Sequence, residues 1–482
     1  MDKKVNKSLG RNFLSVSGGQ FLSLLLNLIS VGLAGKYLGV NGFGEFNYLL
    51  AIIAIIAAGL DFGINPIVFR EISKNPKNSG MIISTLYFRM FLFILVAIGY
   101  NFYAFYTNLK DESIIIFNIL FINIIFSNKY QNFRELLAIP MKVELKMHKY
   151  MIIVIGENIL FLILVFLIPL FDLGLLYFSI IYTVSNIPGF FIILNIITRA
   201  KIPTKLKIEE IKWLVKESLP IGVYLILSSI FYQIDTIFLQ HLSSSESVGL
   251  YSAGVRLSRP LMIIPNALVM SVFPMIVNKI QFKQLDVKQL NFLIKLLVLI
   301  AGLFFTLSVF KAEEICSFVF GEAFRNAGKA FSLLIAALVF MYLNYFLLDI
   351  LTALEKQRYN FYIAVIVLVV SIISNLILIP QYNYIGAGVS LILSTFIGTI
   401  VLVSLYRKLF FSLTIIEIRT IIFFLLLLSF AFIISSIPLL LFALIMVILS
   451  LILLVKCRVL SKYEWTILLK LINKEKWIDW VL

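Results

Sequence analysis

The sequence is poor in the residues that form soluble surfaces and metal sites. Only 14% of its 482 residues are charged, and it contains two histidines and two cysteines. No His-Glu-x-x-His motif occurs, and the glycine-rich stretch 39–44 lacks the Gly-Lys-Ser/Thr ending that holds nucleotide phosphates. The sequence therefore predicts no metal site, no cofactor and no ATPase domain. Any transport would have to draw on a proton or sodium gradient, on the membrane potential, or on consumption of the substrate elsewhere.

Long apolar segments make up most of the sequence. The chain is 61% hydrophobic with a mean hydropathy of +1.02, and a bilayer core needs about 20 apolar residues per spanning helix. We predict an all-α integral membrane protein with about fourteen transmembrane helices. The segments are 13–35, 46–69, 81–106, 113–130, 150–170, 174–198, 218–240, 248–277, 290–310, 328–353, 359–379, 384–405, 417–436 and 438–455.

Positive charges gather in every second connection between these segments. Most of the 41 Lys and Arg residues fall in such connections, of which 199–216 is the longest. Because short cytoplasmic loops carry an excess of Lys and Arg, we predict an inner-membrane protein with both termini in the cytoplasm. The net charge of +16 then follows from topology, and no nucleic-acid partner is predicted. Cys316 and Cys457 fall on opposite sides, as do His148 and His241, so neither pair can form a bridge or share a metal.

A weak internal repeat divides the chain. The stretch 33–38 followed by Gly44 parallels 238–243 followed by Gly249 at one constant offset. An even number of spans per unit gives two units of the same orientation, so we predict two six-helix lobes in parallel pseudo-repeat plus two C-terminal helices. The alternative is a bundle of unrelated hairpins. The predicted parts are residues 1–200, 218–408 and 409–456, with amphipathic segments at 201–217 and 457–482.

The two amphipathic segments are predicted to lie on the cytoplasmic membrane surface. In the first, Ile208, Ile211, Leu214 and Val215 recur at helical spacing opposite charged residues, and the tail repeats the pattern around Trp465. The first segment is expected to tie the lobes together. The simpler interpretation is a pair of surface helices without any partner.

Ionisable residues inside the spans are the candidate functional groups. They are Asp61, Arg89, Glu157, Asp235, Arg256, Arg259 and Asp349. Each would cost about 2.5 to 3.5 kcal/mol at the middle of a lipid-facing helix, so most are expected to face a wet cavity, pair with each other or snorkel.

The arginines suit an anionic substrate. Arg256 and Arg259 stand three residues apart and share a helix face. Two guanidinium forks on one wall can bind the oxygens of a diphosphate bidentately and stay charged. Alternatively, they pair with Asp235 or snorkel to a headgroup. Arg89 is a further candidate ligand.

The acids are candidates for ion coupling. Asp61 lies between Gly59 and Gly63, where the helix can bend and open backbone groups around the carboxylate. It predicts either a proton or sodium site or an internal hydrogen-bond acceptor. Asp235, in the polar stretch 232–235, has the same two interpretations, and Glu157 and Asp349 are further candidates without a local motif.

Several motifs resemble those of the polysaccharide-unit flippases of bacterial surface-glycan assembly. They are Gly59-Leu60-Asp61-Phe62-Gly63 with Arg70-Glu71, Leu219-Pro220, Tyr232-Gln233-Ile234-Asp235-Thr236, and Val248-Gly249-Leu250-Tyr251-Ser252-Ala253 with Arg256, Pro265 and Pro274. The resemblance covers nearly the whole chain. It implies membership of the multidrug/oligosaccharidyl-lipid/polysaccharide exporter superfamily, a MATE-like fold and alternating access.

The resemblance also implies a substrate and partners. The substrate would be an undecaprenyl-diphosphate-linked oligosaccharide repeat unit for O-antigen or capsule, moved from the inner to the outer leaflet without catalysis, with membrane lipids around the protein. A glycan polymerase and glycosyltransferases of the pathway would be partners, and a monomer is expected. Arg256 matches the position of a cavity arginine in related peptidoglycan-precursor flippases. The first span carries Ser15, Ser17, Gln20 and Asn27 but no arginine, which favours a glycan repeat unit over that precursor.

Three alternatives stay open. A multidrug or cation antiporter, or a peptidoglycan-precursor (lipid II) flippase, would share the fold. A membrane glycan polymerase would need acidic residues in an ordered outer loop, for which Glu313 and Glu314 in the connection 311–326 are the candidates.

Overall fold

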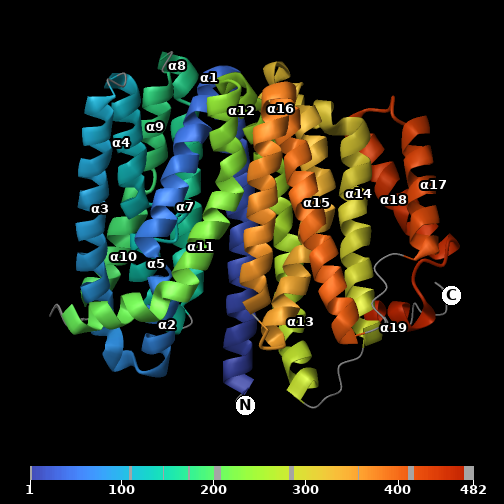
Figure 1. Cartoon of the computed structure of the whole chain (residues 1–482), viewed down its shortest axis with the longest axis horizontal. Coiled ribbons are helices and arrows are strands. Elements are labelled where there is room, and N and C mark those ends of the chain that lie inside the picture. Colours follow the sequence, from blue (N-terminus) through green and yellow to red (C-terminus); the bar gives the residue numbers. More distant parts are fainter. Residues whose placement is uncertain are drawn as a thin grey trace. The chain divides into compact units, whose positions relative to one another are not determined.

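The described part of the chain is helical throughout. The computed structural model describes residues 3–107, 111–144, 146–171, 174–199, 208–281, 287–356, 358–410 and 417–471. Within these ranges the chain forms α-helices, short 3-10 helices and turns, with no strand (Figure 1). The predicted all-α class is therefore confirmed.

The chain divides into two compact units, Met1–Gly249 and Leu250–Leu482. The helices up to the boundary are α1 (Lys3–Asp61), α2 (Ile64–Lys74), η1 (Pro76–Gly80), α3 (Met81–Tyr106), α4 (Asp111–Phe126), α5 (Phe133–Leu137), α6 (Ile139–Val143), α7 (Met147–Val165), α8 (Ile168–Phe171), α9 (Leu175–Val184), α10 (Ile187–Arg199), α11 (Ile208–Leu242) and α12 (Ser245–Ser258), which crosses it. The second unit continues with η2 (Arg259–Met262), α13 (Ile263–Gln281), α14 (Val287–Phe320), η3 (Glu322–Phe324), α15 (Ala327–Ala353), α16 (Arg358–Phe410), α17 (Ile418–Ile433), α18 (Leu439–Lys456) and α19 (Lys462–Leu471). The lobe boundaries at 200 and 218 stay a prediction.

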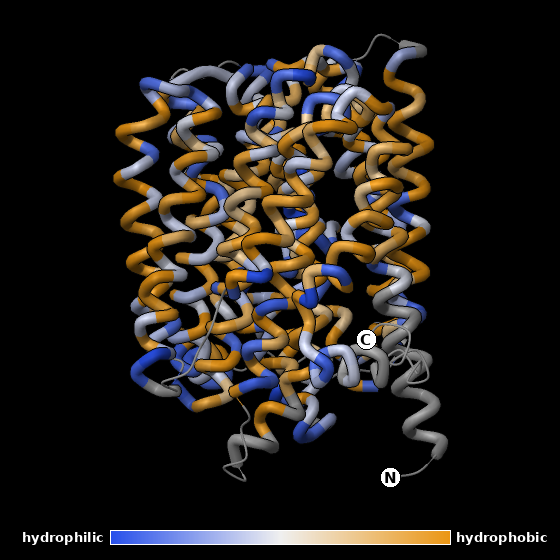
Figure 2. The backbone as a smooth tube through the Cα atoms, turned by 90° about the vertical axis from the view of Figure 1, so that its right-hand side faces the viewer, coloured by the Kyte–Doolittle hydropathy of each residue, from blue (hydrophilic) through white to orange (hydrophobic). Residues whose placement is uncertain are grey.

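Nine helical segments of the described chain are long and apolar enough to cross a membrane. Two of them are interrupted, α1 at Gly39 (φ 67°) and α16 at Asn383 (φ 51°). The interruptions lie at or beside the predicted connections 36–45 and 380–383, so each of these helices covers two predicted spans. Figure 2 shows apolar residues along the lengths of the helices and polar residues concentrated toward their ends. The count of fourteen spans stays a prediction.

The first unit is built around α1. This helix packs along α7 and α11, and α4 packs on α9. The core of this unit includes an aromatic cluster. The centroid of the Phe46 ring lies 4.6 Å from that of Phe178 and 5.3 Å from that of Tyr182. At the turn after α1, Gly63 adopts φ 72° and lies against Gly222 of α11, where an added Cβ would stand 2.8 Å from the Gly222 nitrogen. Only glycine fits this turn and contact without strain.

The second unit is a packed series of helices. α14 packs on α15 and α15 on α16. The predicted C-terminal pair is present as α17 and α18, and the rings of Phe432 and Phe442 lie 6.4 and 6.5 Å from that of Phe310 on α14.

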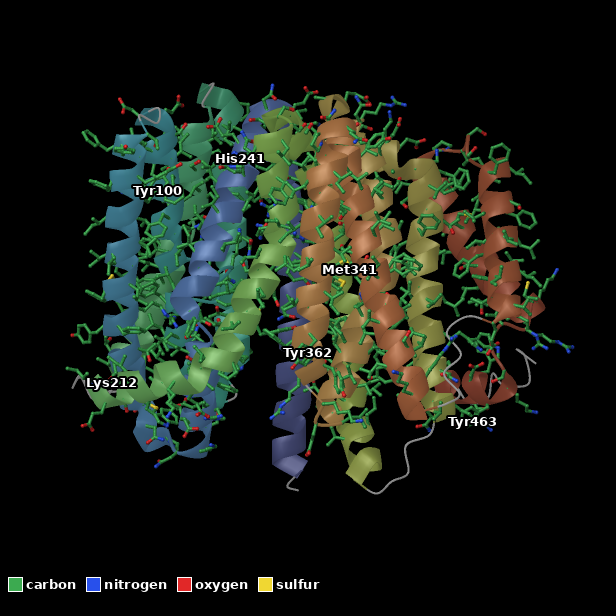
Figure 3. All side chains as sticks on the ribbon, in the orientation of Figure 1. Tyr100, Lys212, His241, Met341, Tyr362 and Tyr463 are labelled. Carbon is green, nitrogen blue, oxygen red and sulfur yellow. The ribbon has the colours of Figure 1, made fainter. Side chains whose placement is uncertain are left out.

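Both amphipathic segments have partners inside the protein, contrary to the simpler expectation. Residues 201–207 and 472–482 lie outside the described residues. The start of α11 is continuous with the following span, and Figure 3 shows Lys212 on a portion that runs across the other helices of its unit. Its Glu217 pairs with Arg70 of α2 at 3.0 Å, and its Glu210 accepts a hydrogen bond from Ser84 of α3 at 2.8 Å. α19 also has an ionic contact inside the protein, because its Glu464 pairs with Lys295 of α14 at 2.9 Å. The amphipathic pattern correctly indicated that one face of each helix is covered. It could not indicate whether lipid or protein covers that face.

Candidate functional site

The end of α1 carries a buried carboxylate at the start of the next helix. Asp61 ends α1, and its side chain is 9% exposed. The carboxylate accepts hydrogen bonds from the backbone nitrogens of Gly63 (3.2 Å) and Asn65 (3.4 Å), which open α2. A negative charge is stabilised at a helix amino terminus by the free N–H groups and the helix dipole. The structure thus shows Asp61 as an internal hydrogen-bond acceptor, one of its two predicted roles.

Arg89 neutralises this carboxylate. The side chain of Arg89, on α3, is fully buried, and its Nη2 lies 2.8 Å from Asp61 Oδ1 and 3.1 Å from Asn65 Oδ1. The guanidinium carbon stands 5.7 Å from the centre of the Phe133 ring, a cation–π distance. Its Nε and Nη1 have no hydrogen-bond acceptor among the described residues. Arg89 is therefore held inside the first unit by the pair and could meet a ligand only after rearrangement.

A broken stretch of chain between α4 and α7 contacts this pair through Asn65. Asn65 Nδ2 donates to the carbonyls of Gln131 (2.7 Å) and Asn132 (3.2 Å), and Asn132 Nδ2 donates to the carbonyl of Ala57 (2.8 Å). Gln131 has φ 49°. Buried backbone carbonyls where a helix is broken need partners inside the protein. Asn65 therefore bonds the backbone of this stretch, and Asn132 connects the stretch to α1.

A second buried ion pair joins the same stretch to α7. Arg134, fully buried on α5, lies 2.5 Å from Glu157, whose side chain is 6% exposed. Arg134 also donates to the carbonyl of Phe126 at 3.3 Å and lies over the Tyr150 ring. A Cβ on Gly189 of α10 would stand 1.7 Å from Glu157 Oε1, so any larger residue at this position would displace the carboxylate from its place beside Arg134.

The sequence interpretation missed Arg134. It counted this residue with the basic inner connection, whereas the structure buries it in the first unit. The available signal was its apolar setting, Phe133 before it and Leu136 and Leu137 shortly after. Glu157, which had no motif, therefore has a partner on a separate element.

The remaining predicted residues lie elsewhere. Asp235 is buried on α11 of the first unit, and Asp349 is half-buried on α15 of the second. Arg256 is half-buried near the end of α12, and Arg259 is exposed at the start of η2. The predicted helix thus changes from α-helix to a 3-10 turn at Arg259. Their roles as ligands or ion-coupling groups stay predictions.

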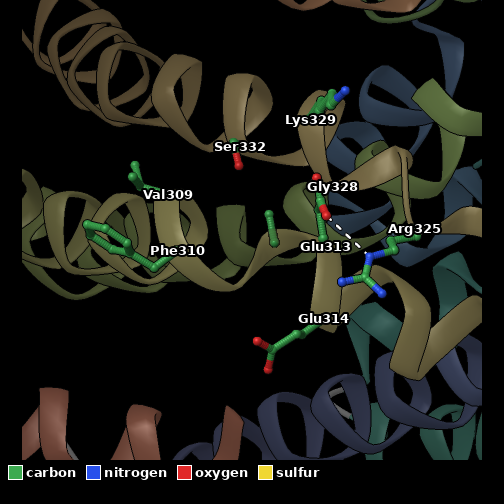
Figure 4. A pocket seen from close by; sticks show the side chains of 9 residues that line it. Val309, Phe310, Glu313, Glu314, Arg325, Gly328, Lys329 and Ser332 are labelled. Atoms are coloured by element: carbon green, nitrogen blue, oxygen red, sulfur yellow. Dashed lines mark hydrogen bonds and ion pairs between the residues drawn. The ribbon is translucent and has the colours of Figure 1, made fainter. Parts of the chain in front are cut away.

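The segment that would serve a polymerase is helical. Glu313 and Glu314 lie on α14, which continues to Phe320, so they are not in a loop. They line a cavity of about 460 Å³ between α14 and the start of α15 (Figure 4). Glu313 lies 3.3 Å from Arg325, and Glu314 pairs with Lys311. Both acids are thus engaged in ion pairs, and the ordered outer loop expected for this alternative is absent from the described chain around them.

Known proteins share this chain's sequence pattern. A family model described as polysaccharide biosynthesis protein matches residues 9–279, more than half of the chain, and one described as MatE matches residues 220–377. The capsular polysaccharide biosynthesis protein CapF of Staphylococcus aureus is 26% identical over 264 residues, covering 52% of this chain and 65% of that protein. The probable flippase AglR of Haloferax volcanii is 29% identical over 185 residues, covering 36% of this chain and 38% of that protein. The chain thus spans less than two thirds of each of these relatives.

Solved structures show the fold. A lipid II flippase, MurJ, in an inward closed conformation superposes with a TM-score of 0.74 at 16% identity, covering 95% of this chain and 99% of that one. An inward-facing multidrug resistance MATE family transporter gives a TM-score of 0.58 at 14% identity, covering 80% and 95%. At these identities the likeness concerns the fold alone. It confirms the predicted MATE-like architecture and a multi-pass membrane protein.

Proposed function

Because the chain belongs to the polysaccharide biosynthesis protein family, we propose that it is a flippase for undecaprenyl-diphosphate-linked oligosaccharide repeat units. It would move them from the inner to the outer leaflet of the bacterial cytoplasmic membrane for surface polysaccharide assembly. The observation that carries the proposal is the family match over residues 9–279. The names of the two relatives, a capsular polysaccharide biosynthesis protein and a probable flippase, agree with it.

The diphosphate is assigned to Arg256. A guanidinium stays charged at any physiological pH and binds phosphate oxygens through two parallel N–H groups. Arg256 is half-buried on α12, where a ligand contact is partly desolvated and therefore stronger, and Arg259 follows it as an exposed second contact. Arg89 is the weakest of the three assignments because it already pairs with Asp61 inside the first unit.

Transport is proposed to follow alternating access, with states close enough in free energy for substrate binding to shift their populations. The ion-coupling candidates divide into two kinds. Asp61 and Glu157 each share their carboxylate with a buried arginine, so protonating either would leave an unpaired buried cation. Asp235 and Asp349 are the other candidates for coupling to protons or sodium ions. We further propose a monomer with both termini in the cytoplasm that passes its product to a glycan polymerase.

The test is lipid-linked oligosaccharide on the inner leaflet after deletion of the gene. Build-up that is reversed by the wild-type copy and not by Arg256→Ala supports both the substrate class and the arginine. Arg256→Lys keeps the charge but loses the planar fork, so we expect only partial rescue. Arg325→Ala, which removes an exposed arginine elsewhere in the second unit, is the matched control and should rescue fully. Full rescue by Arg256→Ala would refute the diphosphate role.

A second candidate is a multidrug or cation antiporter, favoured by the MatE match to residues 220–377. This function predicts no build-up of lipid-linked oligosaccharide after deletion. It predicts instead increased sensitivity to cationic dyes, which the same deletion strain would reveal.

A further inference from the structure

The chain after α18 turns back and docks on α14. The docking residue on α14 is Lys295, whose side chain is 8% exposed. Its Nζ lies 2.9 Å from Glu464 Oε1 of α19 and 3.3 Å from the carbonyl oxygen of Val459. Val459 and Leu460 are buried, with 1% and 5% exposure. The turn before α19 is therefore part of the packed unit and not a loose tail.

Local hydrogen bonds fix the geometry of this docking. The Ser461 N–H donates to Glu464 Oε2 at 2.6 Å, and the Glu464 N–H donates to Ser461 Oγ at 3.3 Å. This reciprocal pair is a capping box at the start of α19. It holds the Glu464 carboxylate in place before Lys295 approaches. Gln289, lower on α14, adds a hydrogen bond to the Tyr463 hydroxyl at 3.3 Å.

Lys295 also holds the beginning of α17. Glu417, immediately before α17, places its Oε1 2.9 Å from the same Nζ. One buried ammonium thus connects three elements, namely α14, the start of α17 and the turn into α19. Because the two carboxylates outnumber the one cation, loss of Lys295 would leave two negative charges facing each other, and they would repel.

The pair α17–α18 also contacts α14 at a second position, farther along that helix. A Cβ on Gly302 would stand 2.2 Å from the Phe424 ring, and Phe310 contacts Phe432 and Phe442. Lys295 and Phe310 are separated by about 22 Å along the helix, at 1.5 Å per residue. The contacts near Phe310 are aromatic. The contacts at Lys295 are ionic, and one of them needs Glu464 of α19.

We propose that residues 457–471 form an intramolecular clasp, which docks on α14 through Lys295 and controls the position of the α17–α18 pair. When docked, the clasp fixes this pair to α14 at the end opposite the aromatic contacts. When released, it frees that end to move. That this movement regulates transport rests on the proposed flippase function, whereas the docking itself does not.

The docking is tested by thiol accessibility in the full-length protein. Val459→Cys in a Cys457→Ser background places a nearly isosteric thiol in the buried turn, and the buried Cys316 reports whether the unit stays folded. Lys295→Met should raise the rate of maleimide labelling at position 459 by about tenfold or more, as expected when one partner of a buried ion pair is removed. Lys295→Arg keeps a positive charge and N–H donors at this position and should keep labelling slow. Lys329→Met, on an exposed lysine of the same unit, is the control and should have no effect.

Unchanged labelling in Lys295→Met would overturn the clasp. If Cys316 becomes reactive as well, the unit has unfolded, and the milder Glu464→Gln decides by the same criterion. In the leaflet accumulation assay, Lys295→Met should lower transport several-fold and Lys295→Arg should preserve it. Faster labelling with unchanged transport would overturn the regulatory part alone, and it would leave the proposed flippase function to its own test.

Discussion

The ion pair between Arg134 and Glu157 offers the sharpest test of how the first unit is stabilised. Both side chains are almost completely shielded from solvent, 0% and 6% exposed, and their charged atoms are 2.5 Å apart. Removing one member of a buried pair leaves an uncompensated charge and typically costs about 3–5 kcal/mol. Removing both charges together is often close to neutral. We therefore expect Arg134→Met and Glu157→Gln each to destabilise strongly, and the double variant to recover most of the loss.

The assay is thermal unfolding of the purified protein in detergent, followed by circular dichroism. For a unit of this size, a loss of 3–5 kcal/mol corresponds to a fall in Tm of roughly 10 °C. The matched control is the pair of Arg70 and Glu217 in the same unit, whose side chains are 42% and 43% exposed. Exposed pairs contribute about 0.2–1 kcal/mol, so Glu217→Gln should shift Tm by only about 2 °C. Equal shifts for Glu157→Gln and Glu217→Gln, or a double variant of Arg134 and Glu157 as unstable as the sum of its singles, would refute the argument.

Two further changes probe the surroundings of the buried charges. Gly189→Ala places a Cβ 1.7 Å from Glu157 Oε1 and should lower Tm by several degrees. The control Gly156→Ala, on α7, meets open space and should be neutral or slightly stabilising. Equal changes in Tm for the two variants would contradict the predicted collision. Asn65→Ala removes the side chain that bonds Arg89 and two backbone carbonyls, so a loss of about 2–3 kcal/mol in unfolding free energy is expected. Asn101→Ala removes an exposed bond to Asn118 and should cost less than about 1 kcal/mol, and chemical unfolding would compare the two.

Hydropathy predicted the positions of several helices well, namely those that consist of one long apolar segment. The predicted segment 81–106 coincides with α3, and 417–436 and 438–455 correspond to α17 and α18. The predicted breaks near Gly39 and Asn383 are present as non-helical residues within long helices. These features follow from local composition, because an apolar run of sufficient length forms a helix wherever it meets lipid or protein.

The buried partners could not be predicted in the same way. A basic residue in a short connection usually marks the cytoplasmic side, so nothing in residue type alone separated Arg134 from exposed neighbours such as Lys146. Arg89 and Asp61 were both recognised as costly in a span, but their pairing depends on how α3 packs against the end of α1. Lys295 lies near the start of the predicted span 290–310 and was counted with the basic connection before it, although Glu417 and Glu464 pair with it in the structure. Such contacts arise from tertiary packing.

The spacing of Arg134 and Glu157 has a consequence for biogenesis. Glu157 follows Arg134 by 23 residues, which at about 5–20 residues per second takes about 1 to 5 s to synthesise. During that interval the arginine has no carboxylate to pair with, and burying an unpaired charge inside a protein is costly. Arg134 therefore cannot settle into its buried position before α7 has been made, so this part of the first unit completes its packing only after α7 is present.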